Sequence, residues 1–90
     1  MTKITISNNK IEIEGHSGWG SAGNDIVCAS ISTAVYFLIH MSNCKYKIDR
    51  GMVTEITTKN TDSKTLNVFI DYAKELSVQY PNNIEVIYEV

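Results

Sequence analysis

A cysteine and a histidine stand twelve residues apart in the stretch GHSGWGSAGNDIVCA, residues 15–29. His16 enters a glycine-rich segment, and Cys28 falls three or four residues into an expected helix. A thiol at such a position is favoured as thiolate by the helix macrodipole and by unpaired backbone N–H groups. The same N–H groups, with amides of the loop, could form an oxyanion hole. A nearby imidazole can stabilise the thiolate and later protonate a leaving amine.

The same residues also fit roles without catalysis. A free cysteine in an apolar helix is commonly a core residue. Asp25 has a sufficient role as a helix cap, and Trp19 could simply anchor the loop. A metal site built from His16, Asp25 and Cys28 lacks a fourth ligand at a recognisable spacing, so no metal or other cofactor is expected. The residues alone leave open a thiol enzyme and a small binding domain.

The second histidine and the second cysteine are set aside by position. His40 lies twelve residues along the same helix from Cys28, or ~18 Å at ~1.5 Å per residue. It cannot share a proton with Cys28 within one subunit. Cys44 follows that helix and fits the inward face of a hairpin, which predicts a buried, inert thiol.

Length and charge limit the class of protein. Ninety residues predict one domain over residues 1–90, and a net charge of −2 argues against direct nucleic-acid binding. The N-terminus lacks the apolar core of a signal peptide, and the longest apolar run is shorter than the ~20 residues of a bilayer span. Two cysteines make no disulfide framework. We expect a cytoplasmic protein without a membrane partner.

The first two strands are expected over residues 2–7 and 10–14, where apolar and polar residues alternate. Asn8 and Asn9 between them suit a two-residue turn, because asparagine tolerates positive φ. A hairpin of this length places four isoleucines on one face. The expected pairs are Ile6 with Ile11, Ile4 with Ile13 and Lys3 with Glu14.

Four glycines then mark an irregular loop at residues 15–23, with Trp19 as its one large side chain. A helix follows, capped by Asn24 or Asp25 and ending near Asn43. Apolar residues cover most of its circumference, so we expect burial on several sides. Small residues on its first half indicate a closely packed neighbour: a strand, a substrate chain or a second subunit.

The remaining chain predicts a hairpin at 44–49 and 52–59, a helix from Asp62 to Gln79 and a strand at 84–90. For this hairpin we favour a three-residue loop, Asp49-Arg50-Gly51, which pairs Ile48 with Met52, Tyr46 with Thr54 and Cys44 with Ile56. A two-residue loop would turn Ile56 outward. The order ββαββαβ predicts an α+β fold, a mainly antiparallel sheet with both helices packed on one face.

The motifs GHSG at 15–18 and GNDIVCAS at 23–30 resemble those of the ribosomal-processing cysteine protease family, Prp. The twelve-residue interval and the QYP at 79–81 are also similar. The resemblance implies a cytoplasmic, homodimeric endopeptidase that removes the N-terminal extension of large-subunit ribosomal protein twenty-seven. It makes Cys28 the nucleophile, His16 the general base and Asp25 a supporting acid. The segment that binds substrate or gates the site would comprise Gly15, Gly18, Trp19, Gly20, Gly23 and Ser32.

The chain departs from the family pattern in a few places. Ser17 and Ser30 stand where alanine is common, and both substitutions are small. The chain is also short around its second hairpin, which leaves the dimer surface and the substrate groove open. Two alternatives remain beside the protease: a non-catalytic module that binds a ribosomal protein's N-terminal strand at a sheet edge, and a redox-sensing thiol.

Overall fold

The computed structural model describes residues 1–21 and 24–89. Five strands and two helices follow one another in the predicted order ββαββαβ. Their bounds are β1 Thr2–Ile6, β2 Lys10–Glu14, α1 Ile26–Ser42, β3 Tyr46–Asp49, β4 Met52–Thr57, α2 Ser63–Gln79 and β5 Ile84–Tyr88.

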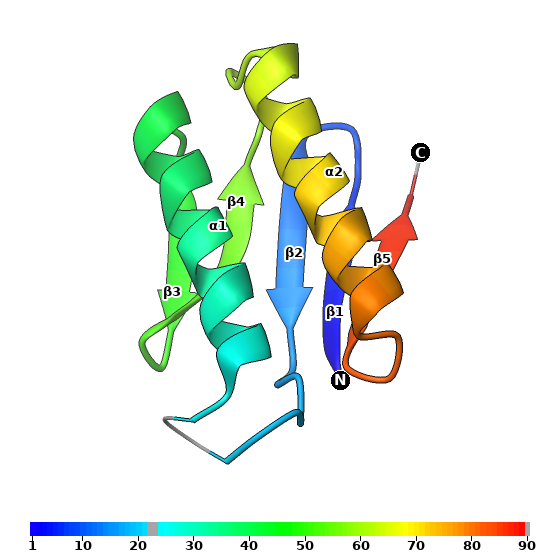
Figure 1. Ribbon diagram of the computed structural model, residues 1–90. Coiled ribbons are helices and arrows are strands. Elements are labelled where there is room, and N and C mark those ends of the chain that lie inside the picture. Colours follow the sequence, from blue (N-terminus) through cyan, green and yellow to red (C-terminus); the bar gives the residue numbers. More distant parts are fainter. Residues whose placement is uncertain (22–23, 90) are drawn as a thin grey trace.

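The strands form one sheet in the order β3-β4-β2-β1-β5. β1 and β5 are parallel, and the other neighbours are antiparallel. Both helices cover the same face of this sheet (Figure 1). The predicted α+β class and the predicted layering are therefore confirmed.

The first hairpin has the predicted register, with Ile4 opposite Ile13 and Ile6 opposite Ile11. All four isoleucines are buried beneath the helices. Ser7 closes the turn, because its backbone N–H and its hydroxyl both donate to the Lys10 carbonyl, at 3.0 and 3.1 Å. The alternation of apolar residues and the two-asparagine turn specify the same pairing, which explains why the register could be predicted from the sequence.

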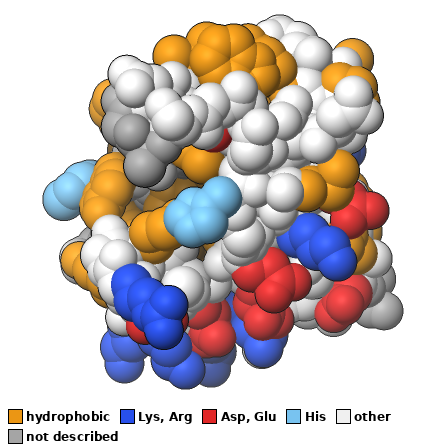
Figure 2. All heavy atoms as spheres, turned by 90° about the horizontal axis from the view of Figure 1, so that it is seen from below, with side chains coloured by type: hydrophobic (Ala, Val, Ile, Leu, Met, Phe, Trp, Pro, Cys, Tyr) orange, Lys and Arg blue, Asp and Glu red, His pale blue; other side chains and the backbone are white. Residues whose placement is uncertain are grey.

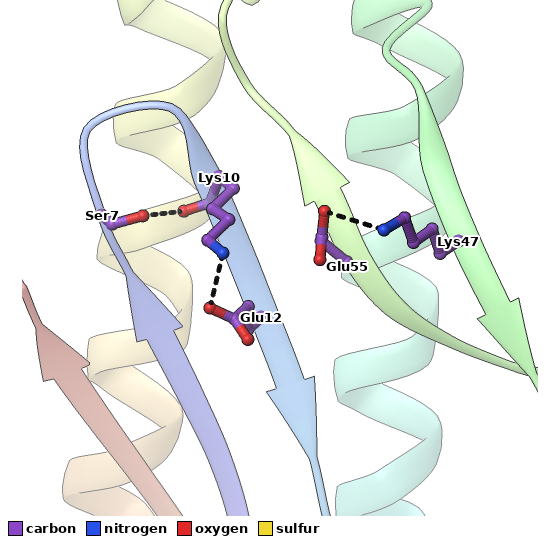
Figure 3. Close-up of polar contacts among 5 residues, drawn as sticks. All are labelled: Ser7, Lys10, Glu12, Lys47 and Glu55. Carbon is purple, nitrogen blue, oxygen red and sulfur yellow. Dashed lines mark hydrogen bonds and ion pairs between the residues drawn. The ribbon is translucent and has the colours of Figure 1, made fainter.

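The other face of the sheet is uncovered and charged. Figure 2, a view from below, shows side chains of both signs gathered on the side of the molecule opposite the helices. Figure 3 shows two ion pairs on this face, Lys10 with Glu12 at 3.3 Å and Lys47 with Glu55 at 3.8 Å. Both pairs are partly or largely exposed, so each contributes little to stability.

The favoured register of the second hairpin is wrong. Arg50 and Gly51, at φ +53° and +79°, form a two-residue turn that pairs Asp49 with Met52 and Ile48 with Val53. The register then shifts by one residue, so that Tyr46 lies opposite Ile56. This bulge restores the inward direction of Ile56, which is fully buried. The alternative two-residue loop was therefore right about the turn and wrong about Ile56.

The helices begin and end as predicted. Asp25 and Asp62 are the N-caps, and Asn43, in the left-handed conformation, ends α1. Tyr80, before Pro81, leaves the helical conformation and ends α2. In α2 the predicted face is buried at Phe69, Ala73 and Leu76.

The expected burial of α1 on several sides is wrong for this single chain. Its inner face is buried, with Val27, Ile31, Val35, Leu38 and Ile39 in the core. Its outer face exposes Phe37 at 64% and Met41 at 70% of their surface. Within the described residues, neither helix is long and apolar enough to span a bilayer.

Candidate active site

The glycine-rich loop leaves β2 at Gly15, which has a φ of +81°. A side chain at this position would overlap the Met1 carbonyl oxygen. Glycine is therefore required twice over, by the left-handed backbone and by the close approach of the N-terminal strand. After this turn, Ser17 lies against the start of α1, where it bonds to Asp25 and Cys28.

Asp25 joins the loop to the start of α1. Its Oδ1 accepts from the backbone N–H groups of Val27 at 3.0 Å and Cys28 at 2.9 Å. Its Oδ2 accepts from the Ser17 hydroxyl and from the Gly20 backbone N–H at 3.2 Å. The hydrogen bond from Ser17, followed by the bond from the Cys28 amide, lowers the pKa of Asp25 to about 2. The carboxylate thus caps the helix and holds the loop at the same time.

This arrangement corrects one expectation about the oxyanion hole. The Val27 and Cys28 amides at the helix start already donate to Asp25. The Ala29 amide donates to the Asp25 carbonyl at 3.1 Å. These N–H groups are occupied, and the carboxylate beside them offsets the positive end of the macrodipole.

The sulfur of Cys28 accepts a hydrogen bond from the glycine-rich loop. The Ser17 backbone N–H donates to Sγ of Cys28 at 3.3 Å. Ser17 is only 2% exposed, and its Oγ also accepts from the Trp19 amide at 3.2 Å. The Ser17 carbonyl accepts from Nδ2 of Asn83 at 2.8 Å, a residue in the turn between α2 and β5. The loop is therefore fixed against the thiol at Ser17.

His16 is exposed and immediately precedes this contact. Two covalent bonds separate its Cα from the Ser17 nitrogen, so that Cα lies within about 6 Å of Sγ. Among the described residues, the hydrogen bonds to the Asp25 carboxylate come from the Ser17 hydroxyl and from backbone amides, and none comes from His16.

Two hollows meet beside these residues, at the end of the molecule viewed in Figure 2. The smaller, about 70 Å³, is lined by Cys28, Ser32 and Tyr36 of α1 and by apolar residues of the sheet. The larger, about 520 Å³, is lined by His16 and by charged residues of β2 and the second hairpin. Both include Gly15, Met52 and Val53, so they form neighbouring parts of one surface.

The other predicted loop residues differ in their roles. Gly18 has a φ of +72°, which suits glycine, and Gly20 donates to Asp25. Trp19 is 47% exposed, so the buried Ser17, rather than the indole ring, anchors the loop. Gly23 lies outside the described residues.

The residues set aside from the sequence lie away from this network. His40 lies in the last turn of α1, and Cys44 is half-buried against the core. Burial raises the pKa of the Cys44 thiol, which fits the inert role predicted for it. Within residues 1–21 and 24–89 no three potential metal ligands come together.

Sequence reasoning missed Ser17 and Asn83. A serine opposite an acidic helix cap is a recognisable hydrogen-bonding pair, and this signal was available for Ser17. Asn83 is separated from Ser17 by 66 residues. Only the topology of the sheet brings these two residues together.

Comparisons with known proteins identify the family of this chain. The model of the family described as cysteine protease Prp matches residues 1–85. The ribosomal processing cysteine protease Prp of Mycoplasma pneumoniae is 39% identical over 36 residues. That alignment covers 40% of this chain and 36% of the relative, so it spans about a third of the relative's length.

Solved structures share the fold. Two are of an essential ribosomal processing protease Prp from S. aureus. In complex with a covalently linked product peptide it has a TM-score of 0.88 and 20% identity, over 99% of this chain and 100% of that chain. In complex with a substrate peptide it has a TM-score of 0.81 and 21% identity over the same shares. SMU.848 from Streptococcus mutans follows at a TM-score of 0.69 and 22% identity, over 97% of this chain and 90% of that chain.

Proposed function

Since this chain belongs to the cysteine protease Prp family, we propose that it is a cysteine endopeptidase with Cys28 as nucleophile and His16 as general base. One observation carries the proposal most directly. The peptide unit between His16 and Ser17 lies against the Cys28 sulfur, with the Ser17 amide donating to Sγ at 3.3 Å. A nucleophile and a base candidate therefore share one small surface.

The reaction follows from these two groups. The Cys28 thiolate attacks the scissile carbonyl carbon, and a tetrahedral oxyanion forms. Protonated His16 gives its proton to the departing amine as the C–N bond breaks, which leaves a thioester on Cys28. Neutral His16 then takes a proton from water, and the resulting hydroxide attacks the thioester. The carboxylic acid product leaves, and the thiolate and the imidazolium are restored.

The proposed substrate is the N-terminal extension of large-subunit ribosomal protein twenty-seven, cut during ribosome maturation in the cytoplasm. Its support is family membership together with the ribosomal processing role in the name of the Mycoplasma relative. The hollows beside Cys28 and His16 offer an extended peptide a place to lie across the loop and the second hairpin.

The test is cleavage of a peptide that spans a candidate extension site, with products identified by mass spectrometry. We expect cleavage by the wild type, loss of at least ~10³-fold in rate for Cys28→Ala, and no loss for the matched control Cys44→Ala. Equal cleavage by Cys28→Ala and wild type would overturn the nucleophile assignment. Binding of the peptide without turnover would favour the peptide-binding alternative, and oxidation of Cys28 by mild peroxide without cleavage would favour the redox alternative.

We also propose that two copies associate through the outer face of the helices. A hollow of about 590 Å³ between α1 and α2 is lined mainly by small and apolar residues. Phe37, Met41 and Val68 border it and are each more than 60% exposed. An apolar face of this kind is typical of an interface between protein chains.

A further inference from the structure

Asn83 is connected to the Cys28 sulfur through a single residue. Its side-chain amide donates to the Ser17 carbonyl at 2.8 Å, and the Ser17 backbone N–H donates to Sγ at 3.3 Å. Asn83 itself is held on both sides of its backbone. Its N–H donates to the Tyr80 carbonyl at 3.0 Å, and its carbonyl accepts from the Thr2 amide at 2.8 Å. Asn83 is thus fixed in the turn before β5 and is hydrogen-bonded to the start of β1.

Ser17 is held by each of its polar groups. Its hydroxyl donates to Asp25, its amide donates to Cys28, and its carbonyl accepts from Asn83. The Asp25 contact fixes the side chain, and the Asn83 contact fixes the backbone on the far side of the residue. Without the Asn83 contact, the Ser17 backbone could rotate about its side-chain anchor and withdraw the N–H from the sulfur.

The Ser17 amide matters because nearby donors are already engaged. The amides of Val27 and Cys28 donate to Asp25, and the charge of that carboxylate opposes a thiolate next to it. Three titratable side chains lie in the elements around Cys28. Tyr36 lines the same hollow, His16 belongs to the loop, and Asp25 caps the helix. A backbone N–H aimed at Sγ stabilises the anion specifically, since hydrogen bonds to charged groups are the stronger class.

We propose that Asn83 is a positioning residue of this site: it holds the Ser17 N–H on Sγ of Cys28 and so favours the thiolate. Its importance for catalysis rests on the proposed protease function. Its effect on the thiol does not, because reactivity of Cys28 can be measured without a substrate.

The experiment measures alkylation of Cys28 by iodoacetamide as a function of pH, with peptide mapping to separate Cys28 from Cys44. Asn83→Ala is compared with Asn82→Ala, an exposed neighbour in the same turn. For Asn83→Ala we expect the midpoint of the Cys28 profile to rise by about one pH unit. The rate at neutral pH should fall only about threefold, because a more basic thiolate is also more nucleophilic. Cys44, in the same sample, is the internal reference and should not change.

A second pair of variants protects the test against misfolding. Asn83→Asp keeps the size of the side chain but removes the donor, and Asn82→Asp controls for the added charge. The proposal predicts a rise in the Cys28 midpoint for both Asn83 variants and for neither Asn82 variant. An unchanged midpoint in folded Asn83 variants overturns it, even if the plateau rate increases through greater access. If the midpoint shifts while the wild type cleaves no peptide, the positioning role stands and the protease function fails.

Discussion

Asp25 lies where the glycine-rich loop meets the start of α1. Its two oxygens accept four hydrogen bonds, two from the first turn of α1 and two from the loop. A sequence can identify such a residue as a cap, but it does not show the second set of donors. The structure therefore assigns Asp25 both a capping role and a loop-holding role, and it places the charge of Asp25 on the backbone amide of Cys28.

The lowered pKa of Asp25, about 2, predicts an acid-dependent loss of stability. A carboxylate with a depressed folded pKa stabilises the fold fully above its unfolded value of ~3.9, and this contribution is lost as the pH falls towards 2. Urea unfolding between pH 5 and 2 should show a steeper loss of stability for the wild type than for Asp25→Asn. Asp71→Asn, on the exposed side of α2, should retain the wild-type slope. Identical slopes for wild type and Asp25→Asn would contradict the assignment.

At the scale of the elements, local signals explain what could be predicted. The first hairpin combines strict alternation with a two-asparagine turn, and both helices carry an aspartate cap. The second hairpin carries a turn sequence that fits two loop lengths, and its bulge depends on packing of Ile56 against the core. Such packing is a long-range effect and leaves no mark on the turn residues.

The same division holds for the candidate site. His16, Asp25 and Cys28 are close in the chain, so spacing and resemblance identify them together. Ser17 has a chemical signal near the cap, but Asn83 has none, because its partner is 66 residues away. Polar contacts between distant segments are the part of a site that one sequence does not contain.

Gly15 and Gly18 allow a matched test of how β2 leads into the loop. Both have positive φ, but a Cβ at Gly15 would overlap the Met1 carbonyl, whereas a Cβ at Gly18 would meet nothing within 4 Å. Gly18→Ala should cost about 1–2 kcal/mol of stability, because a side chain is strained at this positive φ. Gly15→Ala should cost more, about 2–5 kcal/mol, because β1 must also shift to relieve the overlap. Equal losses in urea unfolding would show that the contact with Met1 is not restrictive.

At the scale of the whole molecule, the parallel pairing of β1 and β5 explains why the site is where it is. Parallel strands start at the same edge, so Thr2 and Asn83 are neighbours there. β2 is antiparallel to β1 and therefore ends at that edge, where Gly15 begins the loop. The N-terminus, the turn before β5 and the loop thus converge at the start of α1 (Figure 1). Because β5 runs parallel to β1, the turn before β5 lies at the candidate active site and brings Asn83 to Ser17.

The outer face of the two helices, which borders the hollow between α1 and α2, predicts self-association. Burial of Phe37 and Met41 at an interface between two copies would contribute ~1.5–3 kcal/mol for each side chain. In sedimentation over a range of concentrations, we expect the wild type to be dimeric and Phe37→Ser with Met41→Ser to be monomeric. Ile48→Ser is the control, since Ile48 is 54% exposed on the edge strand β3 and does not line the hollow between α1 and α2. A monomeric wild type, or dissociation caused equally by Ile48→Ser, would place the interface elsewhere or remove it.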